Sequence, residues 1–230
     1  MIAGGTGGAT EAQDFWVFKT DARGRLVWNK TFDHLENVGS MEQARCVIRA
    51  HDSGYVIAGF NYEFTSYWNM EPWLVKVHED GELAWPIRVF GVTSRDDAAY
   101  SVIATSDGGY LLTGSRKFGI GTSDNLWLLK TDGTGNEVWN RTLTNDVCNL
   151  GSCVSQTADG GYLVGGWTHL ATFKTDANGL LLETKVQARG GTLDRGCSWI
   201  AGTPDGGTAL VGSVGQLRLA LERLHWRDRQ

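Results

Sequence analysis

The sequence predicts an all-β protein, namely a β-propeller of four-stranded antiparallel blades. A lysine recurs after an apolar run and before a Gly-containing turn, at Lys19, Lys76, Lys130 and Lys174, with separations of 57, 54 and 44 residues. A repeated unit of roughly 40 to 50 residues that holds four short strands is typical of propellers. The chain also holds 31 glycines and only 3 prolines, as expected for many tight turns between continuous strands.

The first two segments of each unit, strands a and b, are predicted to form a hairpin. Strand a is an apolar run rich in aromatic and branched residues, which favour a buried, pleated surface. The connector to strand b favours a type I turn completed by a glycine in the left-handed conformation. Strand a begins at Phe15, Pro72, Leu126 and Ala171, and strand b is predicted at 24–28, 81–85, 135–139 and 179–183.

The third and fourth segments, strands c and d, are predicted to form a second hairpin. Strand c begins at Ala44, Ala99, Gly151 and Cys197, and strand d is predicted at 55–59, 110–114, 162–166 and 208–212. The turns between them contain Asp followed by glycine, so that the Asp side chain bonds its own backbone and glycine supplies a positive φ. Each period is therefore predicted to be a meander in the order a, b, c, d.

Residues 1–230 are interpreted as one propeller domain with four complete blades and a partial one. The predicted blades span about 14–60, 72–115, 126–167 and 170–213, with strand d of a preceding blade at 1–5 and strand a of a following blade at 217–224. Two arrangements fit this pattern. Either the two single strands pair and close a ring of about five blades, or the sequence is a fragment of a propeller of six to eight blades.

The runs KTDARGRLVW, KTDGTGNEVW and SVIATSDGGYLLTG resemble the propeller-like repeat of archaeal and bacterial cell-surface proteins, in the quinoprotein and WD40-like superfamily. The spacing of Gly81 to Trp85 and of Gly135 to Trp139 is similar to the tryptophan-docking motif, in which a Trp of each blade wedges against its neighbour. The fourth unit has Glu183 in place of that Trp. We predict structural roles for the repeated tryptophans Trp16, Trp28, Trp73, Trp85, Trp127 and Trp139.

Composition and charge argue against several classes of partner. The net charge of −5 argues against a nucleic-acid or acidic-membrane surface, because both require basic patches. No apolar stretch approaches the ~20 residues that span a bilayer, so membrane insertion is not expected. The first residues lack the basic start and apolar core of a signal peptide. The expected location at the cell surface or outside the cell therefore depends on the resemblance.

Four cysteines leave two interpretations open. Cys46 and Cys153 occupy equivalent positions in strand c, where the second unit has Ser101, which favours small buried thiols. Cys148 and Cys153 lie five residues apart, close enough for a local disulfide in an oxidising compartment.

The two edges of the predicted propeller differ in their connections. The a–b and c–d turns at one edge are short and uniform, whereas the d–a and b–c loops at the other are long and varied, as is usual for binding loops on a rigid scaffold. We therefore place the candidate ligand-binding site at this long-loop edge. Its predicted residues are Tyr62, Phe64, Tyr67, Trp68, Asp96 and Asp97. Aromatic faces beside polar groups suit sugar rings or peptides.

Carboxylates recur at the long-loop edge, which makes calcium a further hypothesis. They are Asp33, Glu36, Glu42, Asp96, Asp97, Asp146 and Asp194. Oxygen ligands in flexible geometry suit calcium. However, no segment has the spacing of a known calcium loop, and such side chains commonly bond the backbone of their own loops. We therefore expect neither a metal site nor another cofactor.

These observations favour a non-catalytic module, secreted or on the cell surface, that binds a protein or a glycan. The sequence lacks the motifs of zinc hydrolases, serine nucleophiles and phosphate-binding loops. The alternative is a propeller enzyme, either a quinoprotein-like oxidoreductase or a carbohydrate-active hydrolase or lyase that uses loop carboxylates. A structural spacer is a third hypothesis. Open sheet edges at the ends also suggest self-association.

Overall fold

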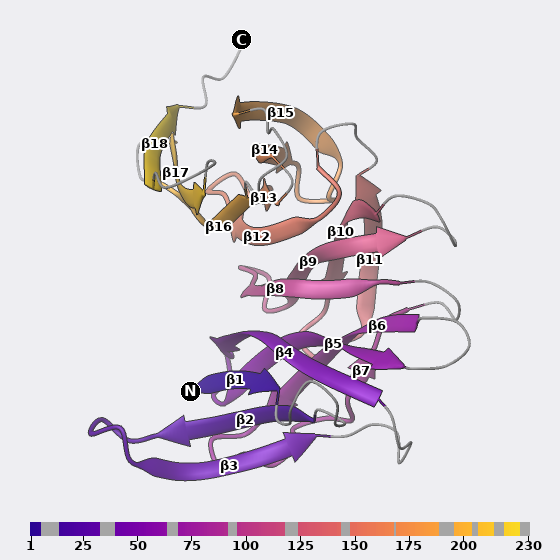
Figure 1. Ribbon diagram of the computed structural model, residues 1–230, viewed down its shortest axis with the longest axis vertical. Coiled ribbons are helices and arrows are strands. Elements are labelled where there is room, and N and C mark those ends of the chain that lie inside the picture. Colours follow the sequence, from indigo (N-terminus) through magenta and orange to yellow (C-terminus); the bar gives the residue numbers. More distant parts are fainter. Residues whose placement is uncertain are drawn as a thin grey trace.

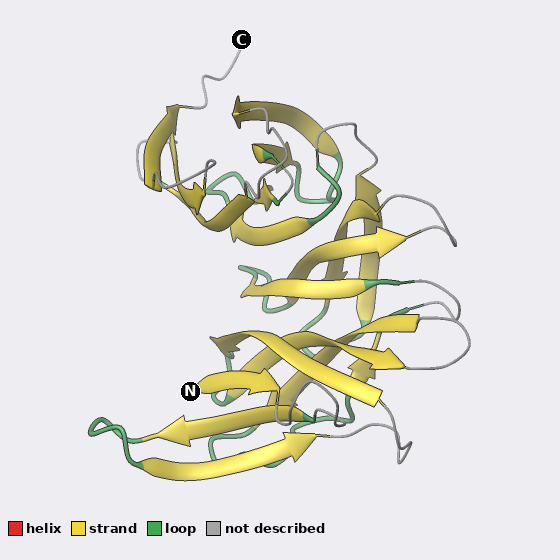
Figure 2. Ribbon diagram, in the orientation of Figure 1, coloured by secondary structure: helices red, strands yellow, loops and turns green. Residues whose placement is uncertain are grey.

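The computed structural model describes residues 1–5, 14–32, 40–63, 69–91, 96–117, 124–143, 148–167, 169–188, 196–203, 207–213 and 219–225. These residues form strands and turns, without any helix (Figure 2). They make five antiparallel sheets, which follow one another in chain order from the N-terminus to the C-terminus (Figure 1). The prediction of an all-β protein with antiparallel, blade-like sheets is therefore confirmed.

The sheets are numbered one to five along the chain. Sheet one contains β1 (Ile2–Gly5), β2 (Phe15–Thr20) and β3 (Leu26–Phe32). Sheet two contains β4 (Ser40–Arg49), β5 (Tyr55–Glu63), β6 (Asn69–Val77) and β7 (Arg88–Val89). Sheet three contains β8 (Ala98–Ala104), β9 (Tyr110–Lys117), β10 (Asp124–Thr131) and β11 (Glu137–Leu143). Sheet four contains β12 (Gly151–Gln156), β13 (Tyr162–Gly166), β14 (Leu170–Thr175) and β15 (Leu181–Ala188). Sheet five contains β16 (Gly196–Gly202), β17 (Gly207–Ser213) and β18 (Leu219–His225).

The strand order corrects the predicted blade boundaries. Each complete sheet has the order c, d, a, b, so strands a and b of one unit join strands c and d of the unit before it. The sheets therefore span 40–89, 98–143 and 151–188, not 14–60, 72–115, 126–167 and 170–213. The reason is the d–a pairing, which is a long hairpin: β5 pairs with β6 over nine successive residue pairs. The chain crosses between sheets in the b–c connection instead.

The two terminal strands each belong to a neighbouring sheet. β1 pairs with β2, and β18 pairs with β17. The arrangement in which residues 1–5 pair with 217–224 to close a ring is therefore wrong for this structure. In the part of the chain that is described, sheets one and five lie at opposite ends of the row (Figure 1).

Strand b of sheet two is shorter than expected. The sequence predicted it at 81–85, but β7 contains only Arg88 and Val89. Pro86 lies two residues before the start of this segment, and proline has no N–H to donate to a neighbouring strand. The other b strands begin two residues after their turn glycines, at Leu26, Glu137 and Leu181.

Consecutive sheets pack face to face through their c strands. β4 contacts β1 and β2, β8 contacts β4 and β5, β12 contacts β8 and β9, and β16 contacts β12 and β13. The spaces between sheets are filled by apolar side chains. Between sheets two and three, for example, Leu74, Val102, Leu112 and Trp127 belong to one buried cluster. Each such side chain contributes about 1.5–3 kcal/mol on burial, which is why the strands are apolar on both faces.

Tryptophans interlock the sheets at the short-turn edge. A Cβ added to Gly81 would lie 3.0 Å from the Trp28 ring, one added to Gly135 would lie 3.2 Å from Trp85, and one added to Gly179 would lie 2.6 Å from Trp139. Each tryptophan thus covers the a–b turn glycine of the next sheet, which is the geometry that the docking resemblance implies. The other repeated tryptophans lie on strand a, where Trp73 and Trp127 are fully buried and Trp16 is half-buried.

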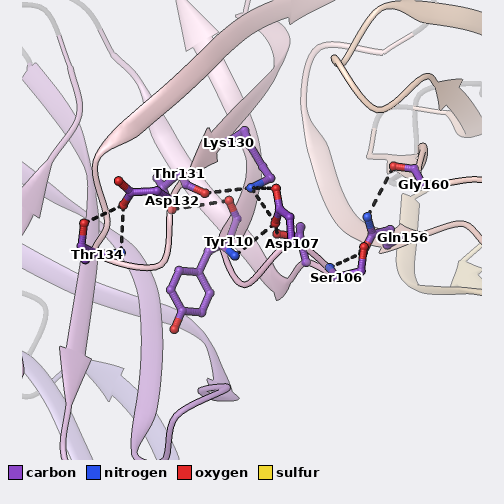
Figure 3. Close-up of polar contacts among 11 residues, drawn as sticks. Ser106, Asp107, Tyr110, Lys130, Thr131, Asp132, Thr134, Gln156 and Gly160 are labelled. Carbon is purple, nitrogen blue, oxygen red and sulfur yellow. Dashed lines mark hydrogen bonds and ion pairs between the residues drawn. The ribbon is translucent and has the colours of Figure 1, made fainter.

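The recurring lysines hold the c–d turns against strand a. The Nζ atom lies 2.7 Å from Asp52 for Lys76, 2.9 Å from Asp107 for Lys130 and 3.1 Å from Asp159 for Lys174. Figure 3 shows Lys130 between Asp107 and the carbonyl oxygen of Thr131. A lysine this deeply buried requires a paired carboxylate, so the repeated lysine is a structural residue. Lys19, in a sheet without a c strand, pairs with Glu79 of sheet two.

Two turn carboxylates of sheet three, Asp107 in the c–d turn and Asp132 in the a–b turn, lead us to expect that acid destabilises the protein. Burial alone would raise the pKa of Asp107, but hydrogen bonds from Thr105 and Lys130 lower that pKa to about 2. Backbone and side-chain bonds from Asn136 and Thr134 lower the pKa of Asp132 to about 2 as well. A folded-state pKa below the ordinary value of 3.8 means that the carboxylate stabilises the fold above about pH 4 and loses this contribution as the pH falls towards 2.

We therefore expect the midpoint of urea unfolding to fall steadily between pH 5 and pH 2. The double variant Asp107→Asn, Asp132→Asn should be less stable at pH 5. Its unfolding midpoint should also depend less steeply on pH, because these two turn carboxylates no longer titrate. A midpoint of the natural protein that stays constant over this interval would contradict the assigned role of the turn carboxylates.

Candidate functional site

Part of the predicted site lies outside the described residues. This holds for Phe64, Tyr67 and Trp68 of the aromatic loop and for the carboxylates Asp33, Glu36, Asp146 and Asp194. Tyr62, Asp96 and Asp97 are described, and they lie at the roots of the long loops, where β5 ends and β8 begins.

Asp97 lies in a buried polar network at the root of a long loop. It is fully buried, and its Oδ2 accepts a hydrogen bond of 2.8 Å from Nε of Arg116. Arg116 also donates to Asn140 (2.7 Å) and stacks 5.0 Å from the centre of the Trp127 ring. The indole N–H of Trp127 donates to the same Asn140 oxygen. Because its carboxylate is committed to this network, we do not include Asp97 in the candidate site described below. The predicted carboxylate Glu42 is buried as well.

Asp96 has a different environment from its neighbour. Its Oδ2 pairs with Nζ of Lys117 at 2.9 Å, and both side chains are partly exposed. Its Oδ1 is buried and accepts no hydrogen bond from any residue that the structure describes. Asp124 lies opposite Lys117 in the β9–β10 register, and burial raises the pKa of Asp124. The hydrogen bond to Asp96 raises the pKa of Lys117. The Lys117 ammonium group thus forms an ion pair with Asp96 and attracts the Asp124 carboxylate through its charge, at the long-loop edge of sheet three.

Aromatic side chains from sheets two and three meet at the boundary between the two sheets. The rings of Phe60 and Tyr100 meet edge to face, with centroids 6.0 Å apart. The exposed guanidinium of Arg45 lies 5.2 Å from the Phe60 ring and 5.8 Å from the Tyr100 ring. Burial raises the pKa values of Tyr62 and Tyr100. The charge of Asp96 adds to the shift of Tyr62, whereas a hydrogen bond with Ser115 and the charge of Arg45 partly offset the shift of Tyr100. Both phenols therefore remain protonated donors at neutral pH.

We call the set Arg45, Tyr62, Asp96, Tyr100, Lys117 and Asp124 the junction site. It combines two carboxylates, two cations and two phenols around a boundary between rigid sheets. Such a set can donate and accept hydrogen bonds while the aromatic rings present apolar faces, which suits polar ligands with stacking surfaces.

Sequence reasoning missed four of these residues. Arg45 and Tyr100 are the extra residues of equivalent β-bulges, since the register skips from Ala44 to Cys46 and from Ala99 to Ser101. Bulges often redirect a side chain next to a functional site. Alignment of the repeats would have shown that these two residues occupy equivalent positions in their units. Lys117 and Asp124 flank one long loop, which was the available signal for them.

The described residues contain no group of three or more His, Cys, Asp or Glu side chains that could hold a metal ion. They also contain no helix that could cross a membrane.

Comparison with known proteins supports the fold class and goes no further. No protein-family model matches the sequence, and no curated protein matches it significantly. A solved structure of a protein of unknown function from Bacteroides caccae is similar, with a TM-score of 0.57 and 11% identity, covering 97% of this chain and 72% of the other. At this identity the likeness concerns the fold alone. The class defined by the fold is an all-β, propeller-like protein of repeated antiparallel sheets.

Proposed function

We propose that the protein is a non-catalytic, propeller-like binding or scaffold module that takes a protein or glycan ligand at its long-loop edge. The observation that carries this proposal is the contrast between its two edges. At the short-turn edge, charged side chains such as Lys130 and Asp107 hold turns in place. At the long-loop edge, the junction site leaves Arg45 exposed, and one oxygen of Asp96 accepts no hydrogen bond from the described residues.

The rigidity of the supporting frame adds to the argument. Asp97, Arg116 and Asn140 fix the strand ends directly beneath the junction site. A site whose frame is already ordered loses little conformational entropy on binding. The loop residues Tyr67 and Trp68 belong to the same edge by sequence, and we include them in the proposed ligand-binding surface.

Three further assignments belong to this proposal. The repeat and its docking tryptophans support membership in the quinoprotein and WD40-like superfamily of cell-surface repeat proteins. We infer a location at the cell surface or outside the cell on the same resemblance. We also propose that the module works without a cofactor, and that its partners include neither nucleic acid nor membrane lipid, in keeping with its net charge of −5.

Parallel glycan and peptide arrays test the proposed function. The natural chain should bind at least one class of probe, and the double variant Tyr67→Ala, Trp68→Ala should lose most of this binding because stacking area is removed. A matched control is Trp199→Ala, which removes an exposed tryptophan from β16. Equal binding by the natural chain and the double variant would remove the aromatic loop from the site, and binding to neither array would contradict the proposal.

A further inference from the structure

Two cysteines from consecutive sheets meet in the interior. Cys153 lies on β12 and Cys197 on β16, and their Sγ atoms are 3.0 Å apart. Both side chains are buried. Cys148, which the sequence offered as the partner of Cys153, instead places its Sγ 3.4 Å from the carbonyl oxygen of His169. The structure therefore replaces the suggested local pair with a pair that is 44 residues apart in sequence.

The repeat shows that this meeting is specific to one sheet boundary. Each c strand contains a β-bulge. Cys153 and Cys46 occupy equivalent positions just after the bulge of their strands, and Cys197 and Ala99 occupy equivalent positions just before the bulge of theirs. At the boundary of sheets two and three, Cys46 accordingly packs against the cluster that contains Ala99. Only the boundary of sheets four and five has cysteine at both corresponding positions among the described c strands.

Gly165 provides the space for both sulfur atoms. It lies opposite Cys153 in the β12–β13 register. A Cβ at this position would lie 2.5 Å from Sγ of Cys197 and 2.6 Å from Sγ of Cys153. The equivalent positions in sheets two and three are Ala58 and Thr113. Among sheets two, three and four, glycine therefore occupies this position only in the sheet whose cysteine meets a second cysteine.

We propose that Cys153 and Cys197 form a disulfide bond that joins the innermost strands of sheets four and five when the protein folds in an oxidising environment. The oxidant is a low-molecular-weight disulfide such as oxidised glutathione. The thiolate of one of the two cysteines attacks one sulfur of this disulfide and releases one thiolate. The thiolate of the other cysteine then attacks the protein sulfur of the mixed disulfide and releases the second. Two protein thiols are oxidised, the small disulfide is reduced to two thiols, and the two cysteine protons pass to the leaving thiolates.

Because both thiols are buried in the folded protein, the reaction belongs to folding, before the two sheets close on each other. This inference does not depend on the proposed ligand or on the junction site.

Refolding followed by peptide mapping tests the proposal. The full chain is refolded from urea with reduced and oxidised glutathione, remaining thiols are alkylated under denaturing conditions, and the protein is digested with trypsin. Peptide 142–174, which contains Cys148 and Cys153, should be linked to peptide 196–218, which contains Cys197. The linked pair should be two hydrogens lighter than the sum of the reduced peptides. The Cys148→Ser and Cys46→Ser variants should retain the link, which assigns it to Cys153.

Thermal unfolding provides a second measurement. The oxidised chain should unfold about 5 to 15 °C above the reduced chain, and Gly165→Ala should reduce the yield of the link. Finding all four cysteines alkylated after refolding, or Cys148 linked to Cys153 within peptide 142–174, would overturn the proposal.

Discussion

Replacing Arg116 with methionine is expected to lower the free energy of unfolding by about 3–5 kcal/mol, because this change leaves a buried charge without its partner. Asp97 is fully buried, and Arg116 is nearly so. Methionine retains much of the packing volume against Trp127, so the loss reports the missing positive charge. Urea unfolding followed by tryptophan fluorescence measures the effect.

A second variant separates charge from packing. Arg116→Met combined with Asp97→Asn removes both charges but retains an acceptor for the backbone N–H of Lys117, which bonds Asp97 Oδ1. We expect the double variant to be more stable than Arg116→Met alone. Arg25→Met, which breaks the exposed pair of Arg25 with Asp21, should cost at most about 1 kcal/mol. Equal losses for the single and double variants would show that the buried charge is not the cause.

Replacing Trp139 with alanine is expected to lower the free energy of unfolding by about 3 kcal/mol, at the lower end of the range for buried tryptophans because this ring is half-buried. The variant removes the ring that covers Gly179 of the next sheet. It also removes the contact with Tyr162, whose ring centroid is 6.1 Å away. The loss should therefore appear at the boundary between sheets three and four.

Hydrogen exchange can locate this effect. In Trp139→Ala, amides of β14 and β15 should exchange faster, whereas those of β5 and β6 should not change. The neighbouring residue Val138 is exposed, so Val138→Ala should alter stability by less than about 0.5 kcal/mol. A Trp139→Ala variant as stable as Val138→Ala would contradict the docking role.

The sequence was sufficient to predict the strands, except for β7 at Arg88–Val89, but not their assignment to sheets. Recurring turn glycines such as Gly81 and Gly135 specify where strands begin and end through local backbone conformation, and these signals are local. The order a, b, c, d is the same in the sequence whether strands a and b join strands c and d of their own unit or those of the unit before it. The turn residues do not specify that choice, which depends on whether strands also pair across the longer d–a loop, as β9 and β10 do.

The same distinction between local and nonlocal interactions explains the outcome for the site. Tyr62 and Asp96 were predicted from their place in loops. The buried network of Asp97 was not predicted, because its partner Arg116 lies 19 residues away and nothing in the local sequence links the two. Likewise, Cys148 seemed the nearer partner for Cys153, whereas the fold places Cys153 beside Cys197.

The central claim is that the long-loop edge binds the ligand while the rest of the surface supports the fold. Titration of the strongest array ligand against two charge-neutralising variants tests this claim most directly. Asp124→Asn alters the junction site, and Glu137→Gln alters an exposed carboxylate on the outer strand β11. We expect Asp124→Asn to weaken binding by about tenfold, as for a lost hydrogen bond to a charged group, and Glu137→Gln to leave the Kd unchanged. Unchanged binding by Asp124→Asn together with weaker binding by Glu137→Gln would contradict the account.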